Sequence, residues 1–321
     1  MLFILRFDLR NPAFAGIALA DRYHAALDMI EWADQRGALA VSLSEHHASE
    51  DGYLPSPLVM AAAVAVRTTN IAIAINALIA PFYDPLRLAE DVAVVDQLSR
   101  GRFNLTIAGG YAEHEFEMFG VELAERPAHV RETVEVLRAA WTGEPFEFRG
   151  RTVQVLPTPA QAGGPPIVLG GSSEPAARRA ARIADAFVPS DQACWEFYRD
   201  ECLLLGKPDP GPSFGGTADV VVLAEDPEAA WPVIGPHFMH ESNAYGAWSP
   251  TAGVGAYRPV ADIDELRAGS QYRILTPDEY AAELRAEGEL ALAKLHPMVG
   301  GIPPELAWQH LRLFEEAFLG G

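Results

Sequence analysis

The chain of 321 residues is poor in cysteine, in basic residues and in long apolar runs. Its only cysteines, Cys194 and Cys202, fall in one stretch that reads as a helix, which excludes a disulfide framework and indicates a reducing compartment. No uncharged run reaches the roughly 18 residues that a membrane-spanning helix needs. With 24 basic against 44 acidic residues the formal net charge is -20, which disfavours nucleic acids and anionic membranes as partners.

A hydrophobic content of 49% is enough for a sizeable core. The apolar N-terminus "MLFILRFDLRNP" lacks the basic region and the longer hydrophobic segment of a signal peptide, so we expect it to begin the fold as a strand. These features predict a soluble, cytoplasmic protein that acts on a small molecule.

Apolar runs that read as strands alternate with amphipathic stretches that read as helices. Eight strands are predicted, at 2–8, 38–44, 70–80, 102–110, 165–171, 185–190, 217–225 and 290–297. Helical patterns follow most of them, at 21–37, 56–69, 84–101, 126–141, 173–184, 193–206 and 303–319. Such alternation favours a parallel sheet covered by helices, and eight units favour closure as a single (β/α)8 TIM-type barrel over residues 1–321.

One long insertion, residues 226–276, separates the seventh predicted strand from the eighth and is rich in Gly, Pro and aromatic residues. A structureless loop of that length is rare in a compact domain, so we expect part helix and part lid. Within it, residues 237–260 are expected to be mobile, to have little regular structure and to close over the barrel mouth.

Residues that directly follow the strands are candidates for an active site, because TIM barrels place their sites at the carboxyl ends of the strands. The segment 170–173, "GGSS", precedes a helix, so backbone N–H groups, hydroxyls and the positive helix end converge on one position that suits a phosphate. The alternative is a tight turn with an ordinary cap from Ser173. A second pair, Gly109 and Gly110, would let a flat ring or a phosphate approach the backbone.

The second predicted strand ends in Glu45, His46 and His47. If the strand continued, the two imidazoles would point in opposite directions, so at most one faces the barrel mouth. There it can exchange a proton with a bound heterocycle, while Glu45 or a neighbour fixes its tautomer. A metal site would need further ligands that no motif supplies, and the third alternative is that both histidines only form loop hydrogen bonds. We treat the other histidines as structural or exposed by default, namely His114, His129, His237, His240 and His310.

Several segments together resemble the bacterial luciferase-like family of flavin-dependent monooxygenases and oxidoreductases. The resemblance covers nearly the whole chain, in the order "SEHHASEDGYLPSPLVMAAA", "YDPLRLAEDVAVVDQLSRGRFNLTIAGGYAEHEFEMFGV", "PPIVLGGSSEPAARRAARIADAF" and "LTPDEYAAELRAE" with "KLHPMVGGIPPELAWQHLRLFEEAFL". It implies a barrel that holds reduced FMN, or in a sister branch the 5-deazaflavin coenzyme F420.

The resemblance also implies roles for particular residues. His46 takes the place of the active-site histidine, Asn76 that of a contact to the isoalloxazine ring, and 170–173 (Gly170, Gly171, Ser172 and Ser173) that of the phosphate-binding segment. Many members that use FMN carry an arginine after the fourth strand, whereas "IAGGY" offers Gly109. That departure points toward deazaflavin, and "SEHH" points toward FMN.

The expected reaction is monooxygenation of a small organic substrate by oxygen and reduced FMN, which a separate flavin reductase supplies. The alternative is hydride transfer with deazaflavin, and a third possibility is a non-catalytic flavin-binding protein. We expect a homodimer, no metal, and His46 as the catalytic residue.

Overall fold

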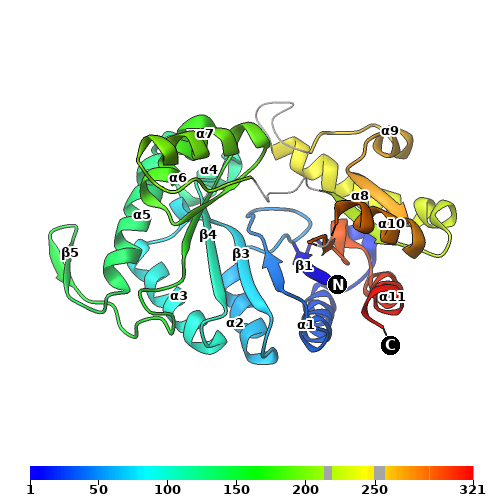
Figure 1. Ribbon diagram of the computed structural model, residues 1–321, viewed down its shortest axis with the longest axis horizontal. Coiled ribbons are helices and arrows are strands. Elements are labelled where there is room, and N and C mark those ends of the chain that lie inside the picture. Colours follow the sequence, from blue (N-terminus) through cyan, green and yellow to red (C-terminus); the bar gives the residue numbers. More distant parts are fainter. Residues whose placement is uncertain (213–218, 249–256, 289, 321) are drawn as a thin grey trace. The chain divides into compact units, whose positions relative to one another are not determined.

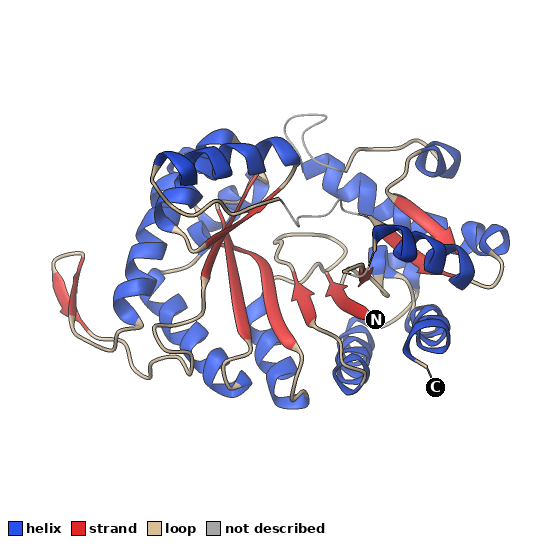
Figure 2. Cartoon of the chain, viewed as in Figure 1, coloured by secondary structure: helices blue, strands red, loops and turns tan. Residues whose placement is uncertain are grey.

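The computed structural model describes residues 1–212, 219–248, 257–288 and 290–320. Parallel strands and helices alternate along the chain, and the residues cluster into two compact units (Figures 1 and 2). Unit 1 comprises residues 1–55, 67–72 and 217–321, and unit 2 comprises 56–66 and 73–216. No helix of the described residues is long and apolar enough to cross a membrane.

Unit 1 contains five parallel strands that pair in the order β10-β9-β11-β1-β2. Their bounds are β1 Leu2–Phe7, β2 Ala40–Leu43, β9 Val220–Leu223, β10 Tyr272–Leu275 and β11 Leu292–Leu295. The helices are α1 Leu19–Gln35, α8 Pro227–Trp248, α9 Ile263–Ala268, α10 Pro277–Glu287 and α11 Pro304–Phe314, with short turns η1 Ala13–Ala15, η4 Val299–Gly301 and the π-helix η5 Glu315–Leu319.

Unit 2 contains four parallel strands in the order β3-β4-β7-β8 and a separate antiparallel hairpin of β5 and β6. The strands are β3 Ala72–Ile79, β4 Phe103–Ala108, β5 Phe146–Phe148, β6 Arg151–Val153, β7 Ile167–Gly171 and β8 Ala186–Pro189. The helices are α2 Pro57–Arg67, α3 Pro85–Ser99, α4 Glu113–Phe119, α5 Arg126–Ala140, α6 Glu174–Ile183 and α7 Gln192–Leu204, with turns η2 Ala80–Phe82 and η3 Leu123–Glu125.

Local sequence explains where several of these elements begin. Asp84 caps α3 by accepting from the N–H groups of Leu86 and Arg87, and Pro85 fits the first turn because it has no N–H to leave unpaired. Thr276 and Glu279 form a reciprocal capping box at the start of α10.

Along β1, side chains that form the core alternate with side chains on the opposite face of the strand. Phe3, Leu5 and Phe7 are completely buried, and each contributes about 1.5–3 kcal/mol relative to an exposed side chain. Successive side chains of a strand point to opposite faces, so Arg6 and the following Asp8 point away from that core.

All eight predicted strands are present, as β1, β2, β3, β4, β7, β8, β9 and β11. The hairpin β5–β6 and the strand β10 were not predicted. The hairpin strands are only three residues long, too short for a clear alternation of apolar and polar residues, and β10 lies inside the predicted insertion 226–276, where no strand was expected. Whether residues 1–321 form one domain stays a prediction.

The expectation that residues 237–260 have little regular structure is wrong for 237–248, which form the second half of α8. The helix contains Pro232 and Pro236, which ordinarily disfavour a helix interior. Its buried residues, however, follow helical spacing, at Trp231, Ile234, Phe238, Glu241 and Tyr245. Tertiary burial of this face therefore outweighs the loss of two backbone hydrogen bonds to proline. Residues 249–256 lie outside the described residues.

Backbone contacts fix the middle of α8 within unit 1. The ring Nδ1 of His237 lies 3.0 Å from the carbonyl oxygen of Gly300. Gly300 has a φ of 56°, and a Cβ there would overlap the carbonyl of His237. Only glycine allows η4 to approach the helix this closely.

We predict that Asp34→Ala lowers the free energy of unfolding by about 1–3 kcal/mol, because it removes the acceptor of three backbone N–H groups, of which that of Ile71 is buried. The Asp34 carboxylate, on α1, accepts from the N–H groups of Thr69 (2.9 Å), Asn70 (2.8 Å) and Ile71 (2.6 Å). Urea denaturation measures the loss. Asp21→Ala, on the exposed side of the same helix, is the matched control and should change stability by less than about 0.5 kcal/mol. Equal effects in the two variants would contradict the prediction.

Candidate functional site

In unit 2 the predicted cofactor-binding residues lie at the carboxyl ends of β3, β4 and β7. Ile107 of β4 pairs with Leu169 of β7, so the register leads from these strands to the glycines that follow. Asn76 is exposed near the end of β3, where the register with β4 shifts and the peptide bond to Ala77 is cis. A Cβ on Gly170 would lie 3.9 Å from that of Ala77 and 3.8 Å from that of Ala108. The structure therefore brings Asn76, Gly109, Gly110 and Gly170 to one edge of the unit 2 sheet.

The pair Gly109 and Gly110 has separate structural reasons to be glycine. Gly110 has a φ of 73°, and a Cβ there would lie 2.8 Å from Cγ2 of Ile79. At Gly109 a Cβ would lie 3.6 Å from Cγ and Cδ of Arg126, which is ordinary contact. Nη1 of Arg126, the first residue of α5, donates to the carbonyl of Gly110 at 3.1 Å. A guanidinium therefore lies against the end of β4, although "IAGGY" contains none.

The segment 170–173 spans the end of β7 and the start of α6. Ser173 is the N-cap residue of α6, but its side chain forms no cap hydrogen bond, so the alternative of an ordinary serine cap is wrong. Ser172 and Ser173 are exposed, which leaves both hydroxyls accessible beside the first turn of the helix. This arrangement fits an anion such as the phosphate of a flavin.

Gly171 has a packing role. A Cβ on it would lie 2.7 Å from that of Ala176 and 3.3 Å from the ring of Phe187, so a larger residue would displace α6 from β7. Gly170 has ordinary distances only, of 3.5 Å or more. Substitutions that probe phosphate binding without disturbing the fold therefore belong at residues other than 171.

In unit 1, β2 ends at Leu43, so Glu45, His46 and His47 lie in the loop that follows it. All three are buried. Nε2 of His47 lies 2.9 Å from Oε1 of Glu45, so Glu45 pairs with His47. The ring of His46 packs against Trp248, with centroids 4.5 Å apart, and edge-on against Tyr53 at 4.9 Å. His46 therefore lies among aromatic rings.

Arg10 is enclosed by what we call the aromatic cage, formed by Tyr53, Tyr245 and Trp248. Its guanidinium carbon lies 4.6–4.7 Å from each of the three ring centroids, and its side chain is fully buried. Such contacts stabilise a desolvated cation by about 2 kcal/mol each. Nη1 also donates to Asp51 at 2.5 Å. The cage joins the end of α8 to the loops after β1 and β2.

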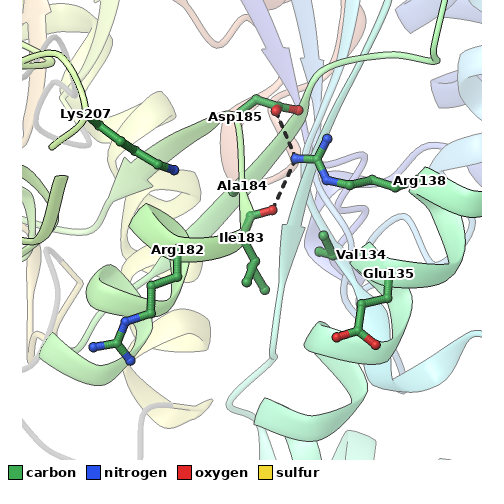
Figure 3. Close-up of a pocket in the computed structure, with 8 residues that line it drawn as sticks. All are labelled: Val134, Glu135, Arg138, Arg182, Ile183, Ala184, Asp185 and Lys207. Atoms are coloured by element: carbon green, nitrogen blue, oxygen red, sulfur yellow. Dashed lines mark hydrogen bonds and ion pairs between the residues drawn. The ribbon is translucent and has the colours of Figure 1, made fainter. Parts of the chain in front are cut away.

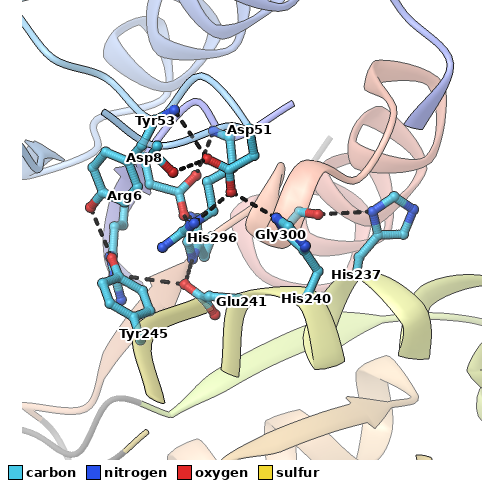
Figure 4. Close-up of polar contacts among 12 residues, drawn as sticks. Arg6, Asp8, Asp51, Tyr53, His237, His240, Glu241, Tyr245, His296 and Gly300 are labelled. Carbon is cyan, nitrogen blue, oxygen red and sulfur yellow. Dashed lines mark hydrogen bonds and ion pairs between the residues drawn. The ribbon is translucent and has the colours of Figure 1, made fainter. Parts of the chain in front are cut away.

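Next to the cage lies a carboxylate–histidine triad of Asp8, Glu241 and His296 (Figure 4). The His296 nitrogens lie 3.7 Å from Asp8 Oδ2 and 3.7 Å from Glu241 Oε1. Burial would raise the pKa of Asp8, but the charges of His296 and Arg10 lower it to about 2. Arg6 lies 3.7 Å from Glu241 and donates to the Tyr245 hydroxyl at 3.0 Å.

The three triad residues each offer one ligand atom, all within 4.8 Å of one another, which is compact enough for a metal ion. Two guanidiniums, Arg6 and Arg10, flank the two carboxylates, and Arg10 lies 3.5 Å from Asp8. A divalent ion would add two positive charges beside these two, so the electrostatics disfavour it. That the protein holds no metal stays a prediction.

Two further histidines of unit 1, His240 and His310, form hydrogen bonds. Nε2 of His240 lies 2.7 Å from Asp51, and this contact together with Arg10 lowers the pKa of Asp51 despite burial (Figure 4). That His240 is structural stays a prediction. His310 is structural, because its Nδ1 accepts from the N–H of Leu223 at 2.8 Å and burial lowers its pKa to about 4.

Sequence analysis missed Arg10, Glu241 and Arg126. The rule that collects residues after strands would have found Arg10 if applied to the first strand. Glu241 and Arg126 lie on helices and carry no local signal.

A cavity of about 380 Å³ in unit 2 lies at the other end of the helices, lined by residues such as Ile183 and Asp185 (Figure 3). Its cations are already paired: Arg138 donates to Asp185 and to the carbonyl of Ile183, and Arg182 to Glu201. It lies near the amino end of β8, whereas the candidate residues lie at carboxyl ends, so we do not assign it to the active site.

Comparison with known proteins finds relatives that use a flavin or a deazaflavin. An F420-dependent glucose-6-phosphate dehydrogenase from Nocardia farcinica is 31% identical over 188 residues, 55% of this chain and 56% of that protein. The oxygenase component of a flavin-dependent trigonelline monooxygenase from Acinetobacter baylyi is 29% identical over 152 residues, 45% of this chain and 42% of that protein. The aligned regions thus span about half the length of these two relatives.

The crystal structure of the monooxygenase RslO1 from Streptomyces bottropensis matches with a TM-score of 0.78 at 26% identity and covers 99% of both chains. This likeness confirms the predicted α/β fold class of TIM type, and closure of the strands into a ring stays a prediction. The model of the family described as luciferase-like monooxygenase matches residues 5–293. This match spans most of the chain, which therefore belongs to the luciferase-like monooxygenase family.

Proposed function

We propose that this protein is the oxygenase of a two-component system that uses reduced FMN and oxygen to monooxygenate a small organic substrate. The family match over residues 5–293 carries the proposal. The relative from Acinetobacter baylyi, named as an oxygenase component, supports a separate reductase, and the likeness to the monooxygenase RslO1 supports oxygen chemistry. Cys194 and Cys202 are both free thiols, which fits a cytoplasmic location.

Reduced FMN would supply the electrons that let oxygen react with the substrate. Asn76, Gly109, Gly110 and the segment 170–173 would hold the cofactor, the last through backbone N–H groups and the hydroxyls of Ser172 and Ser173. His46 would hold or transfer a proton at a ring nitrogen, and the aromatic cage beside it would exclude water from that nitrogen.

A second candidate is hydride transfer with coenzyme F420, which the relative from Nocardia farcinica favours at 31% identity. Two measurements separate it from monooxygenation. Titration with FMN and F420 identifies the tighter cofactor, and reaction under ¹⁸O₂ tells whether the product gains a labelled atom. Tighter binding of F420 together with an unlabelled product would overturn the first proposal.

We predict that His46→Ala reduces turnover by about 10²- to 10⁴-fold, because a positioned acid or base is lost, while cofactor affinity changes much less. The readouts are turnover with any substrate that the parent oxidises and flavin affinity by fluorescence titration. His46→Gln preserves more of the packing against Trp248 but cannot serve as a general base. His24→Ala, on α1, is a control that should leave turnover unchanged. Full turnover in His46→Gln would contradict the role.

Chelation should leave the activity unchanged, because Arg6 and Arg10 already neutralise the carboxylates of the triad. The test is turnover before and after dialysis against EDTA, with metal content measured by mass spectrometry. Loss of activity that returns on addition of one divalent metal would place that ion at Asp8, Glu241 and His296.

We further propose a homodimer. Two apolar pairs are exposed on unit 2 at helical spacing: Val59 and Val66 on α2, at 72% and 67% exposure, and Val94 and Leu98 on α3, at 46% and 42%. Association would remove this surface from water.

Val59→Glu should therefore shift the protein from dimer to monomer in light scattering after size-exclusion chromatography. Leu204→Glu, on the exposed end of α7, is the control and should remain dimeric. A monomeric parent at micromolar concentration, or a dimeric Val59→Glu variant, would refute this interface.

A further inference from the structure

A groove in unit 1 opens between the first half of α8 and the length of α11, with the end of β9 as its floor. Its volume is about 550 Å³. The walls are mainly apolar, formed by Ala230, Val233 and Ile234 on α8 and by Leu306 and Leu313 on α11. Both walls and the floor belong to the same unit, so the groove is a feature of unit 1 alone.

The groove exists because α8 turns away from the strand that precedes it. In an α/β fold with parallel strands, the helix that follows a strand ordinarily covers that strand from outside. The middle of α8 instead bonds to η4 through His237, and its last residues, Tyr245 and Trp248, enclose Arg10. β9 packs against α11. The groove therefore lies where a covering helix of β9 is expected.

The two sides of the first half of α8 differ in what covers them. On the side of α9, the guanidinium of Arg267 lies 4.9 Å from the ring of Trp231, and a Cβ on Gly235 would lie 3.0 Å from Ile263. On the side of the groove, the apolar side chain of Val233 is 52% exposed. Exposed apolar surface that lines a groove is typical of a site where another molecule binds.

The rim of the groove is acidic. Glu225 and Asp226 lie where α8 begins and Glu316 lies near the end of α11, whereas Arg312 is the one cation among the described residues that line the groove. The net charge of -20 means that the protein as a whole repels an acidic partner. A complementary occupant therefore has an apolar face flanked by basic residues.

The form of the groove favours a helix as its occupant. The part of α11 that lines it runs from Leu306 to Glu316, which is about 15 Å of helix. A helix of about three turns presents apolar side chains over that length on one face. An extended peptide would leave its backbone N–H and C=O groups unpaired there, because the walls are the side chains of two helices.

The groove opens at the edge of the unit 1 sheet that also carries candidate site residues. Glu225 and Asp226 follow β9, as Arg10 follows β1 and His46 follows β2, and these strands are parallel. A partner that releases reduced FMN from this groove releases it at the edge that carries His46. The surface proposed above for the homodimer lies on unit 2 and leaves the groove free.

We propose that the groove between α8 and α11 is the docking site for a basic amphipathic helix of the flavin reductase that supplies reduced FMN. The proposal rests on the proposed function, because it takes a separate reductase to be the source of the cofactor. Val233 and Leu313 contact the apolar face of the docked helix, and Glu225 and Glu316 attract its basic residues.

The first test measures binding in the absence of turnover. The probe is a synthetic helical peptide of about 15 residues, with leucine on one face and lysine on the other, and its control has the same residues in scrambled order. Both peptides carry the same charge, so attraction to the acidic protein as a whole acts on both equally. Fluorescence anisotropy should show that the parent binds the helical peptide at least about 10-fold more tightly than the scrambled one.

Variants of the groove make this test specific. Val233→Glu should weaken binding of the helical peptide by about 10-fold or more, because it removes apolar contact, whereas unspecific attraction of lysine would be strengthened by the added negative charge. Arg312→Glu should tighten binding by about 2- to 5-fold. Leu204→Glu, at an exposed apolar residue of unit 2, is the matched control and should bind as the parent does. Circular dichroism checks that each variant is folded.

The second test compares two sources of reduced FMN, namely the flavin reductase of the same organism and FMN that has been reduced photochemically. With the reductase and limiting FMN, Val233→Glu should lower turnover by about 5- to 10-fold, because docking raises the concentration of reduced FMN near the site. With photoreduced FMN its turnover should equal that of the parent, since Val233 lies outside the candidate site.

The two tests separate failure of the groove from failure of the proposed function. Equal binding of the two peptides, an unchanged turnover of Val233→Glu with the reductase, or an equal loss with both sources would overturn the groove while the proposed function stands. Conversion of a dimeric parent to a monomer by Val233→Glu would assign the groove to a second copy of the chain and also overturn it. A parent that is inactive with photoreduced FMN would contradict the proposed function, and with it the reductase as the partner.

Discussion

The buried cation of Arg10 links three parts of unit 1. The Arg10 side chain has no exposed surface, so its charge must be compensated by the protein, and its neighbours come from three parts of the chain. Asp8 follows β1, Asp51 and Tyr53 follow β2, and Tyr245 belongs to α8. Removing Asp8 or Asp51 would leave part of this buried charge uncompensated. The loop that carries His46 is therefore held in place by an arginine that follows β1.

The glycines at the strand ends of unit 2 have two different roles, and the sequence motif alone does not show which glycine has which role. Gly110 and Gly171 are required by packing, since a Cβ would overlap Ile79 or Ala176. Gly109 and Gly170 have room, so there the absence of a side chain leaves space beside the backbone. In the pairs Gly109–Gly110 and Gly170–Gly171, one glycine is therefore required by packing at the edge of the sheet, and the other leaves the backbone there accessible.

Much of the fold could be predicted from the sequence because its determinants are local. Asp84 and Pro85 signal the start of α3, and apolar runs mark the parallel strands other than β10. The candidate site was predictable only where it follows a strand, as with His46 and Gly170. Arg126 could not be placed, because it reaches the end of β4 from the start of another helix. The same limit applies to α8, whose helical state depends on buried contacts that outweigh its prolines.

The close approach of Gly300 to His237 has a consequence for how this protein could change its substrate range. α8 is bonded at its middle to η4, and at its end Tyr245 and Trp248 grip Arg10. A helix anchored at two points cannot rock as a rigid body. Divergence toward new substrates would therefore proceed by exchange of individual side chains along this helix, while the helix backbone keeps its position.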